Sequence, residues 1–219
     1  MYRFSSIFTG SIAIMVCLIS PASNAAEVNI TAEIESVSVQ HGKNQVVIRR
    51  NQDSSNTINP AFAKTSRQCP PFCIQPASLA PGVETIAELE VLDYLKQLTD
   101  GDNSILVVDS RSADWAAKST IPGAINIPWS RLDSDQGANS ISIGEVLQVQ
   151  LKARNLGGLW DYSNAQTLVM FCNGPWSDEA SNSILNLLKY GYPANKIKWY
   201  RGGMQSWESL GLTTVAPVE

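Results

Sequence analysis

The 219-residue chain contains a single histidine, His41, which lies in a polar turn segment. Catalytic triads that depend on histidine and His-rich metal sites therefore have almost no side chains from which to form. Basic residues are also few, since 16 Lys and Arg stand against 20 Asp and Glu and give a net charge of −4. Nucleic-acid binding relies on cations that neutralise phosphates, so we expect no nucleic-acid partner.

A long apolar run occurs at the N-terminus, over residues 7–19, after the single cation of Arg3. Small side chains follow at Ser23 and Ala25, which suits a signal peptide cleaved near Ala25, and we expect an exported, periplasmic protein. A transmembrane anchor is the alternative, but the run is shorter than the ~20 apolar residues of a membrane span. Lipid attachment at Cys17 is disfavoured because the apolar segment continues past it. We expect no stable membrane association.

Cysteine is scarce, with four in the chain. Without the leader, Cys69, Cys73 and Cys172 remain, and an odd number leaves one thiol over in an oxidising compartment. The spacing in CPPFC favours a disulfide between Cys69 and Cys73, with Cys172 free. Two free thiols, or pairing with Cys172, are the alternatives. A zinc site would need two further ligands that are not evident, so we expect neither metal nor cofactor.

Cys172 ends an apolar run, residues 167–172, that is typical of a buried strand. A turn-forming segment, NGPWS, follows at 173–177, and a helix is expected from residue 178. The first N–H groups of a helix lack intrahelical partners and carry partial positive charge, which stabilises a thiolate. This position predicts a lowered thiol pKa and a nucleophilic cysteine. A small buried residue that closes a strand is the alternative.

The N-terminal part, residues 26–81, has little recognisable chemistry. Apolar and polar residues alternate over 27–50, which predicts a β-hairpin or extended arm. Residues 51–60 are polar and read as a linker, and a proline-rich segment with the cysteine pair follows.

From residue 82 onward, short apolar runs alternate with amphipathic segments. Such a pattern predicts an α/β fold whose parallel sheet is covered on both sides. A capping box from Thr85 to Glu88 predicts a helix that starts at Thr85 and buries Leu89, Leu92 and Leu95. We expect strands over 105–108, 124–127, 167–172 and 197–200, and helices over 143–156, 178–189 and 203–210. Ligands in such folds collect beyond the carboxyl ends of the strands.

Four separated motifs follow one another in this part of the chain. They are DSRSADW at 109–115, IPGAINIP at 121–128, Cys172 after its apolar strand, and WYRGGMQSW at 199–207. In order and spacing they resemble the rhodanese-like domain over roughly residues 82–214. The resemblance implies a rhodanese-like parallel sheet flanked by helices and says nothing about residues 27–80. We expect residues 26–81 to form a small N-terminal extension.

The resemblance also implies site residues. Cys172 would be the catalytic residue that carries sulfur as a persulfide. The loop that binds substrate or anion would contain Asn173, Gly174, Trp176 and Ser177. The residues themselves predict that Asp109 is a structural acceptor for loop amides. For Arg111 two interpretations stay open, positive potential near the thiol or a surface ion pair, and Arg201 is a further supporting residue.

Two departures from the family pattern bear on the donor. Pro175 removes an N–H from the loop that should face the sulfur, and Asp178 and Glu179 place carboxylates close to a site meant for an anion. Thiosulfate should therefore be a poor donor unless Arg111 and Arg201 offset that charge. Phosphatases of this fold close their loop with an arginine, which is missing here between Cys172 and Arg201.

We therefore expect a periplasmic sulfurtransferase that moves sulfane sulfur through Cys172. Its partner would be a small sulfane sulfur donor or a protein thiol or persulfide. The alternatives are a non-catalytic rhodanese-like binding module and a thiol–disulfide redox protein. Because Cys69 and Cys73 lie outside the motif-bearing segment, the sequence predicts that they are dispensable for transfer.

Overall fold

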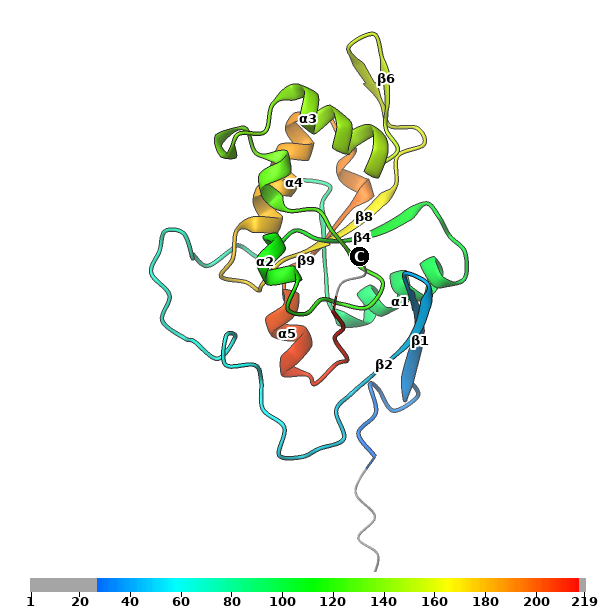
Figure 1. The fold of residues 1–219 in the computed structure, drawn as a ribbon, viewed down its shortest axis with the longest axis vertical. Coiled ribbons are helices and arrows are strands. Elements are labelled where there is room, and N and C mark those ends of the chain that lie inside the picture. Colours follow the sequence, from blue (N-terminus) through cyan, green and yellow to red (C-terminus); the bar gives the residue numbers. More distant parts are fainter. Residues whose placement is uncertain (1–26, 217–219) are drawn as a thin grey trace, which may run out of the picture.

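A computed structural model describes residues 27–216, so the expected signal peptide lies outside the described residues. The centre is a five-stranded parallel sheet in the order β3-β9-β8-β4-β5 (Figure 1). The strands are β3 (Glu84–Ile86), β4 (Ile105–Asp109), β5 (Ile125–Asn126), β8 (Thr167–Phe171) and β9 (Ile197–Tyr200). Val108, Met170 and Trp199 stand side by side across the three central strands. The predicted fold class is confirmed.

One face of the sheet is covered by α3 (Ser140–Glu145), its π-helical continuation η3 (Val146–Gln150) and α4 (Glu179–Lys189) (Figure 1). Ile143, Leu147 and Ile184 are buried here in one hydrophobic cluster with Met170 and Trp199 of the sheet. This face therefore supports the strand that leads to Cys172 and the helix that follows the cysteine.

The opposite face is covered by α1 (Glu88–Thr99), α5 (Gly203–Ser209) and an antiparallel hairpin of β1 (Ser36–His41) and β2 (Asn44–Arg49). Val39 and Ile48 of the hairpin share a second buried cluster with Leu95, Val107 and Trp207. The expected hairpin is therefore present. Its alternating pattern directs the apolar side chains Val39 and Ile48 into the core of the domain.

The prediction that a helix starts at Thr85 is wrong. Thr85 lies in β3, opposite Trp199 of β9, because this short β-branched stretch extends the edge of the sheet. The helix begins after Ala87, whose N–H donates to Glu90 Oε2 at 3.0 Å. Leu89 is therefore 49% exposed, and Val91 takes the buried place beside Leu92 and Leu95.

The helix expected over 143–156 is too long. Helical structure ends at Gln150, and β6 (Arg154–Leu156) turns back to pair with β7 (Leu159–Asp161). Gly157 and Gly158 form the turn with φ of 66° and 98°, a region that glycine enters without a side-chain clash. Short elements complete the fold: α2 (Ala113–Ala116), η1 (Trp129–Leu132), η2 (Ser134–Gln136) and η4 (Ala194–Lys196).

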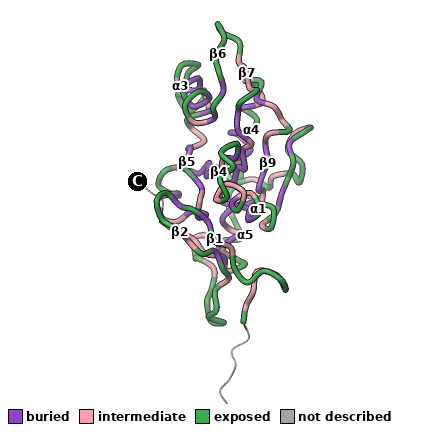
Figure 2. The backbone as a smooth tube through the Cα atoms, turned by 90° about the vertical axis from the view of Figure 1, so that its right-hand side faces the viewer, coloured by how far each residue is buried: buried purple, intermediate pink, exposed green. Residues whose placement is uncertain are grey.

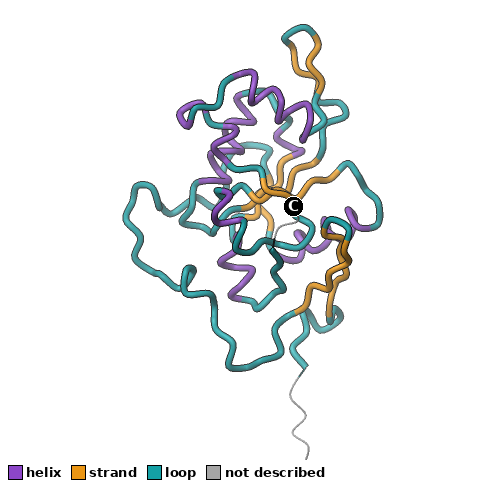
Figure 3. Tube along the Cα trace, in the orientation of Figure 1, coloured by secondary structure: helices purple, strands orange, loops and turns teal. Residues whose placement is uncertain are grey.

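Between β2 and β3 the chain forms a long segment without helix or named strand (Figure 3). It passes along the outside of the molecule beside α5 and α2 and is mostly exposed, unlike the buried central strands (Figures 1 and 2). Cys69 and Cys73 form a disulfide within it, with their Cα atoms 5.0 Å apart. Across residues 27–216, no helix has the length and apolar character needed to cross a membrane.

Candidate active site

Cys172 follows the last residue of β8 and begins the loop that leads into α4. The start of α5 holds this loop, because Met204 N–H donates to Cys172 O at 3.0 Å and Gln205 N–H donates to Asn173 O at 2.9 Å. Gly203 makes the approach possible: its φ is +56°, and a Cβ there would lie 2.3 Å from Cys172 O. The glycine pair of the last motif therefore positions the cysteine loop against α5.

The Cys172 thiol is buried, with 2% of the residue exposed. Its Sγ lies 3.6 Å from Ser177 O and 4.0 Å from Gly174 O. Burial raises the pKa of the thiol to about 11, and the nearby Glu179 carboxylate adds to the rise, while the backbone of Ala180 opposes it. The predicted low pKa is therefore wrong for this conformation, because desolvation of the sulfur outweighs the positive start of α4.

Glu179 points into the cysteine loop. Its Oε2 accepts from Asn173 Nδ2 at 2.8 Å and from Ser177 Oγ at 3.0 Å, and its Oε1 accepts from Ser112 N–H at 3.2 Å. Burial raises the pKa of this carboxyl group. Glu179 thus ties the loop to the segment after β4, whereas the side chain of Asp178, the N-cap residue of α4, makes no capping hydrogen bond.

Asp109 and Arg111 form a buried ion pair. The Arg111 guanidinium donates from Nε to Asp109 Oδ1 at 2.9 Å and from Nη2 to Oδ2 at 2.5 Å. The Arg111 N–H and Thr120 Oγ1 also donate to this carboxylate, at 3.1 and 2.8 Å. Asp109 is therefore the amide acceptor that we expected. Arg111 forms the ion pair that was one of the two interpretations, but the pair is buried and does not lie at the surface.

Arg201 is engaged elsewhere too. Its Nη2 donates to Gln75 O at 2.7 Å, and its Nε donates to Pro76 O at 2.9 Å. The end of β9 thereby holds the segment that precedes β3. Both arginines that could offset the carboxylates thus donate to other groups, and Pro175 contributes no N–H to the loop.

Trp176 forms the outer side of the cysteine loop. The Arg67 guanidinium lies 3.7 Å from the centroid of its ring, and Phe72 packs edge-on at 5.4 Å. Its Nε1 donates to Gln205 Oε1 at 2.9 Å. Sequence reasoning missed Arg67, Phe72 and Gln75 as neighbours of the site, because they lie outside the family motifs and only the tertiary contacts bring them there.

A groove of about 460 Å³ opens beside Trp176. The segment with the disulfide supplies the rest of its lining: Lys64, Thr65, Ser66, Arg67, Cys69, Phe72, Cys73 and Ile74. The expected loop residues Asn173, Gly174 and Ser177 are all buried. Trp176 is thus the part of the cysteine loop that meets this groove.

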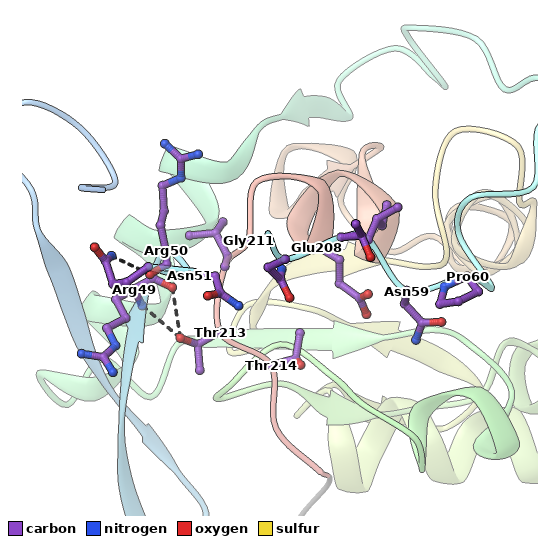
Figure 4. A pocket seen from close by; sticks show the side chains of 14 residues that line it. Arg49, Arg50, Asn51, Asn59, Pro60, Glu208, Gly211, Thr213 and Thr214 are labelled. Atoms are coloured by element: carbon purple, nitrogen blue, oxygen red, sulfur yellow. Dashed lines mark hydrogen bonds between the residues drawn. The ribbon is translucent and has the colours of Figure 1, made fainter. Parts of the chain in front are cut away.

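Figure 4 shows a larger cavity, of about 810 Å³, whose lining includes no residue of the cysteine loop. Arg49, Arg50, Glu208 and Thr213 are among its lining residues, and the two arginine side chains point away from each other (Figure 4). Arg50 Nε donates to Leu210 O at 3.0 Å. No group of three or more His, Cys, Asp or Glu side chains within residues 27–216 is placed to hold a metal ion.

Comparison with known proteins gives a family match. The model of the rhodanese-like domain matches residues 91–210, which is more than half of the chain. No curated protein matches the sequence.

Three similar solved structures are sulfur-transfer proteins by name, and each is a remote neighbour. A thiosulfate sulfurtransferase from Pseudomonas aeruginosa is 21% identical, with a TM-score of 0.39; the alignment covers 62% of this chain and 21% of that one. A human single-domain sulfurtransferase is 24% identical, with a TM-score of 0.33 and coverage of 57% and 96%. A 3-mercaptopyruvate sulfotransferase from Escherichia coli is 20% identical, with a TM-score of 0.37 and coverage of 58% and 43%. On the domain match, which includes β4, the cysteine loop and α5, this chain belongs to the rhodanese-like domain family.

Proposed function

We propose that this protein is a sulfurtransferase in which Cys172 accepts sulfane sulfur as a persulfide and passes it to an acceptor thiol. The observation that carries the proposal is the position of this thiol within a member of the rhodanese-like family. Cys172 is the free cysteine of the described chain, at the junction of β8 and α4, and α5 holds its backbone in place.

The transfer takes two displacements on sulfur. The Cys172 thiolate attacks the outer sulfur of a persulfide donor, the donor S–S bond breaks, and the donor leaves as a thiolate that takes up a proton. An acceptor thiolate then attacks the outer sulfur of the Cys172 persulfide and releases the Cys172 thiolate. No metal or cofactor takes part in this scheme.

The site favours a neutral or protein-bound donor over a dianion such as thiosulfate. Arg111 is neutralised by Asp109, Arg201 binds carbonyl groups, and Glu179 brings a carboxylate into the loop. Trp176 offers an apolar wall beside the groove. These features support a protein persulfide or an uncharged small persulfide as donor.

We also propose that the protein acts in the periplasm, on the basis of the signal-peptide pattern before Ala25. Cell fractionation of the full chain and of a chain without residues 2–25 tests this. Export of the full chain alone, together with loss of the leader mass, is the expected result.

The mass of the protein after exposure to a persulfide donor tests the transfer. We expect a gain of one sulfur atom on the Cys172 peptide and its loss on addition of cyanide. Cys172→Ser should fold but show no gain, because an alcohol cannot carry a persulfide. Sulfur uptake that persists in the serine variant would overturn the assignment.

Burial of the thiol and its raised pKa favour one other function, a non-catalytic binding module. The same experiment separates the two, since a binding module gains no sulfur under any condition. A redox protein that exchanges Cys172 with the cysteine pair would instead form a disulfide between Cys172 and Cys69 or Cys73 and release the other cysteine as a thiol, which peptide mapping detects with no change in total mass.

A further inference from the structure

We propose that the Cys69–Cys73 disulfide is a thiol–disulfide exchange site and that its reduction by a dithiol uncovers Cys172. The partner is a protein or small molecule that carries two thiols and reaches the groove beside Trp176. The inference rests on the proposed function, because the uncovered thiol is the one that would accept sulfur.

Residues 61–76, here called the cover segment, are anchored on the elements around Cys172. Gln75 N–H donates to Pro175 O at 2.8 Å, inside the cysteine loop. Gln75 Oε1 accepts from Ser181 Oγ of α4 at 3.1 Å, and Arg201 at the end of β9 donates to Gln75 O. The cover segment is thus bound to the loop itself and to elements on either side of it.

The disulfide encloses the residue that packs on Trp176. Phe72 lies between Cys69 and Cys73 in sequence, and its ring meets the Trp176 ring edge-on at 5.4 Å. Arg67 lies over the same indole at 3.7 Å. Closing the bond restricts the backbone that carries Phe72, so the disulfide helps to hold Trp176, and with it the outer side of the cysteine loop, in place.

Two contacts of the cover segment contribute little to the stability of the closed state. Arg67 Nη2 donates to Ala61 O at 2.5 Å, but its Nε is buried without a hydrogen-bond partner in the described chain. An unpartnered N–H of a guanidinium loses hydration that opening would restore. Phe72 is 37% exposed, so its contact with Trp176 is peripheral and not part of the core. The closed state is therefore separable from the fold of the domain.

The disulfide is accessible to a reductant. Cys69 is exposed and Cys73 is half-buried, and both line the groove of about 460 Å³. Exposed disulfides are reduced more readily than buried ones. The bond closes a loop of three intervening residues, and short loops yield the least stabilisation of the fold. The disulfide is therefore expected to add little to the stability of the domain.

The exchange proceeds in two displacements. A thiolate of the dithiol attacks Cys69 Sγ, the more exposed sulfur; the Cys69–Cys73 bond breaks, and Cys73 leaves as a thiolate that takes up a proton. The second thiol of the partner attacks the mixed disulfide, which releases Cys69 as a thiol and leaves the partner oxidised to its cyclic disulfide. Two electrons pass from the dithiol to the cysteine pair.

Alkylation of Cys172 by iodoacetamide, followed by mass spectrometry of its peptide, tests the proposal without any sulfur donor. We expect reaction about tenfold faster after reduction with dithiothreitol in native buffer, and in Cys69→Ser/Cys73→Ser without reduction. Phe72→Ala with an intact disulfide should also react faster. Gln68→Ala, an exposed position of the cover segment, is the matched control and should behave as the unaltered protein does.

Equal alkylation rates in the oxidised and reduced protein would overturn the proposal, as would a disulfide that dithiothreitol leaves intact under native conditions. Should the double serine variant fail to fold, the reduced protein and Phe72→Ala still decide. Faster alkylation of the reduced protein without sulfur gain at Cys172 would support the role of the cover segment and overturn the proposed sulfurtransferase function. Equal sulfur gain in the oxidised and reduced protein would support the sulfurtransferase function and overturn the role of the cover segment.

Discussion

At the scale of the residue, Glu179 helps to hold the cysteine loop in its conformation. Its carboxylate accepts three hydrogen bonds within the loop and after β4, and it also raises the pKa of the Cys172 thiol. One side chain therefore holds the loop in shape and disfavours the thiolate. The sequence suggested two carboxylates at the mouth of the site, but the structure turns one of them inward.

Glu179→Gln should lower the pKa of Cys172, because it removes a negative charge that opposes the thiolate. At a fixed pH we expect about tenfold more thiolate for each ~1.4 kcal/mol of repulsion removed. The pH dependence of Cys172 alkylation measures the shift. Asp178→Asn is the matched control on the partly exposed neighbour, and a shift of equal size there would contradict the assignment.

Arg111→Met should destabilise the fold strongly, by about 3–5 kcal/mol, because it leaves the Asp109 carboxylate buried without its cation. The pair of Arg154 and Asp161 at the surface supplies the control, since Arg154→Met should destabilise the fold far less. Urea unfolding of both variants measures the difference. Similar losses would mean that the buried pair adds little to stability.

At the scale of the element, the start of α5 and the cysteine loop form one unit. Gly203→Ala would place a Cβ 2.3 Å from Cys172 O at a φ of +56°, so either the helix start or the loop must move. Gly157→Ala has a similar φ of +66° with nothing within 4 Å, and it isolates the backbone cost of about 1–2 kcal/mol.

We therefore expect Gly203→Ala to lower the free energy of unfolding by clearly more than Gly157→Ala does, as measured in urea. It should also change the alkylation rate of Cys172, whereas Gly157→Ala should leave that rate unaltered. Equal effects of the two variants would show that the close approach of α5 to the loop is easily relieved.

Elements were predicted well where one pattern acted alone. The apolar runs of β4, β8 and β9 read as buried strands, and α4 follows its expected bounds closely. Prediction failed where a local sequence pattern was overridden by a tertiary contact. Thr85 has the residue type of a helix cap, but it lies in β3 because β3 pairs with β9, more than a hundred residues later in the chain.

At the scale of the whole molecule, the buried thiol ties stability to pH. The pKa of Cys172 is raised in the folded state, so the native protein retains the proton that the unfolded chain loses first. The stabilisation is complete below the ordinary thiol pKa and is lost as pH rises toward about 11. The stabilisation amounts to roughly 2–3 kcal/mol.

We expect the stability advantage over Cys172→Ser to shrink by that amount between about pH 8 and pH 11, because serine does not titrate in this range. Tyr192 and Tyr200 have raised pKa values as well, but they are common to both proteins and cancel in the difference. Urea unfolding across this range measures it. A constant difference would show that Cys172 titrates in the native state as it does in the unfolded chain.

The sequence by itself determined the α/β class, the succession of β4, β8 and β9, and the place of Cys172 after a strand, because periodicity and motif order act over short spans of chain. Only the tertiary structure decided that burial raises the pKa of this thiol, that Arg111 pairs with Asp109, and that Arg67 and Phe72 pack on Trp176. These features depend on burial and on contacts between residues that are distant in the sequence or compete for the same charge. Arg201 and Gln75, for example, are 126 positions apart and meet through folding alone.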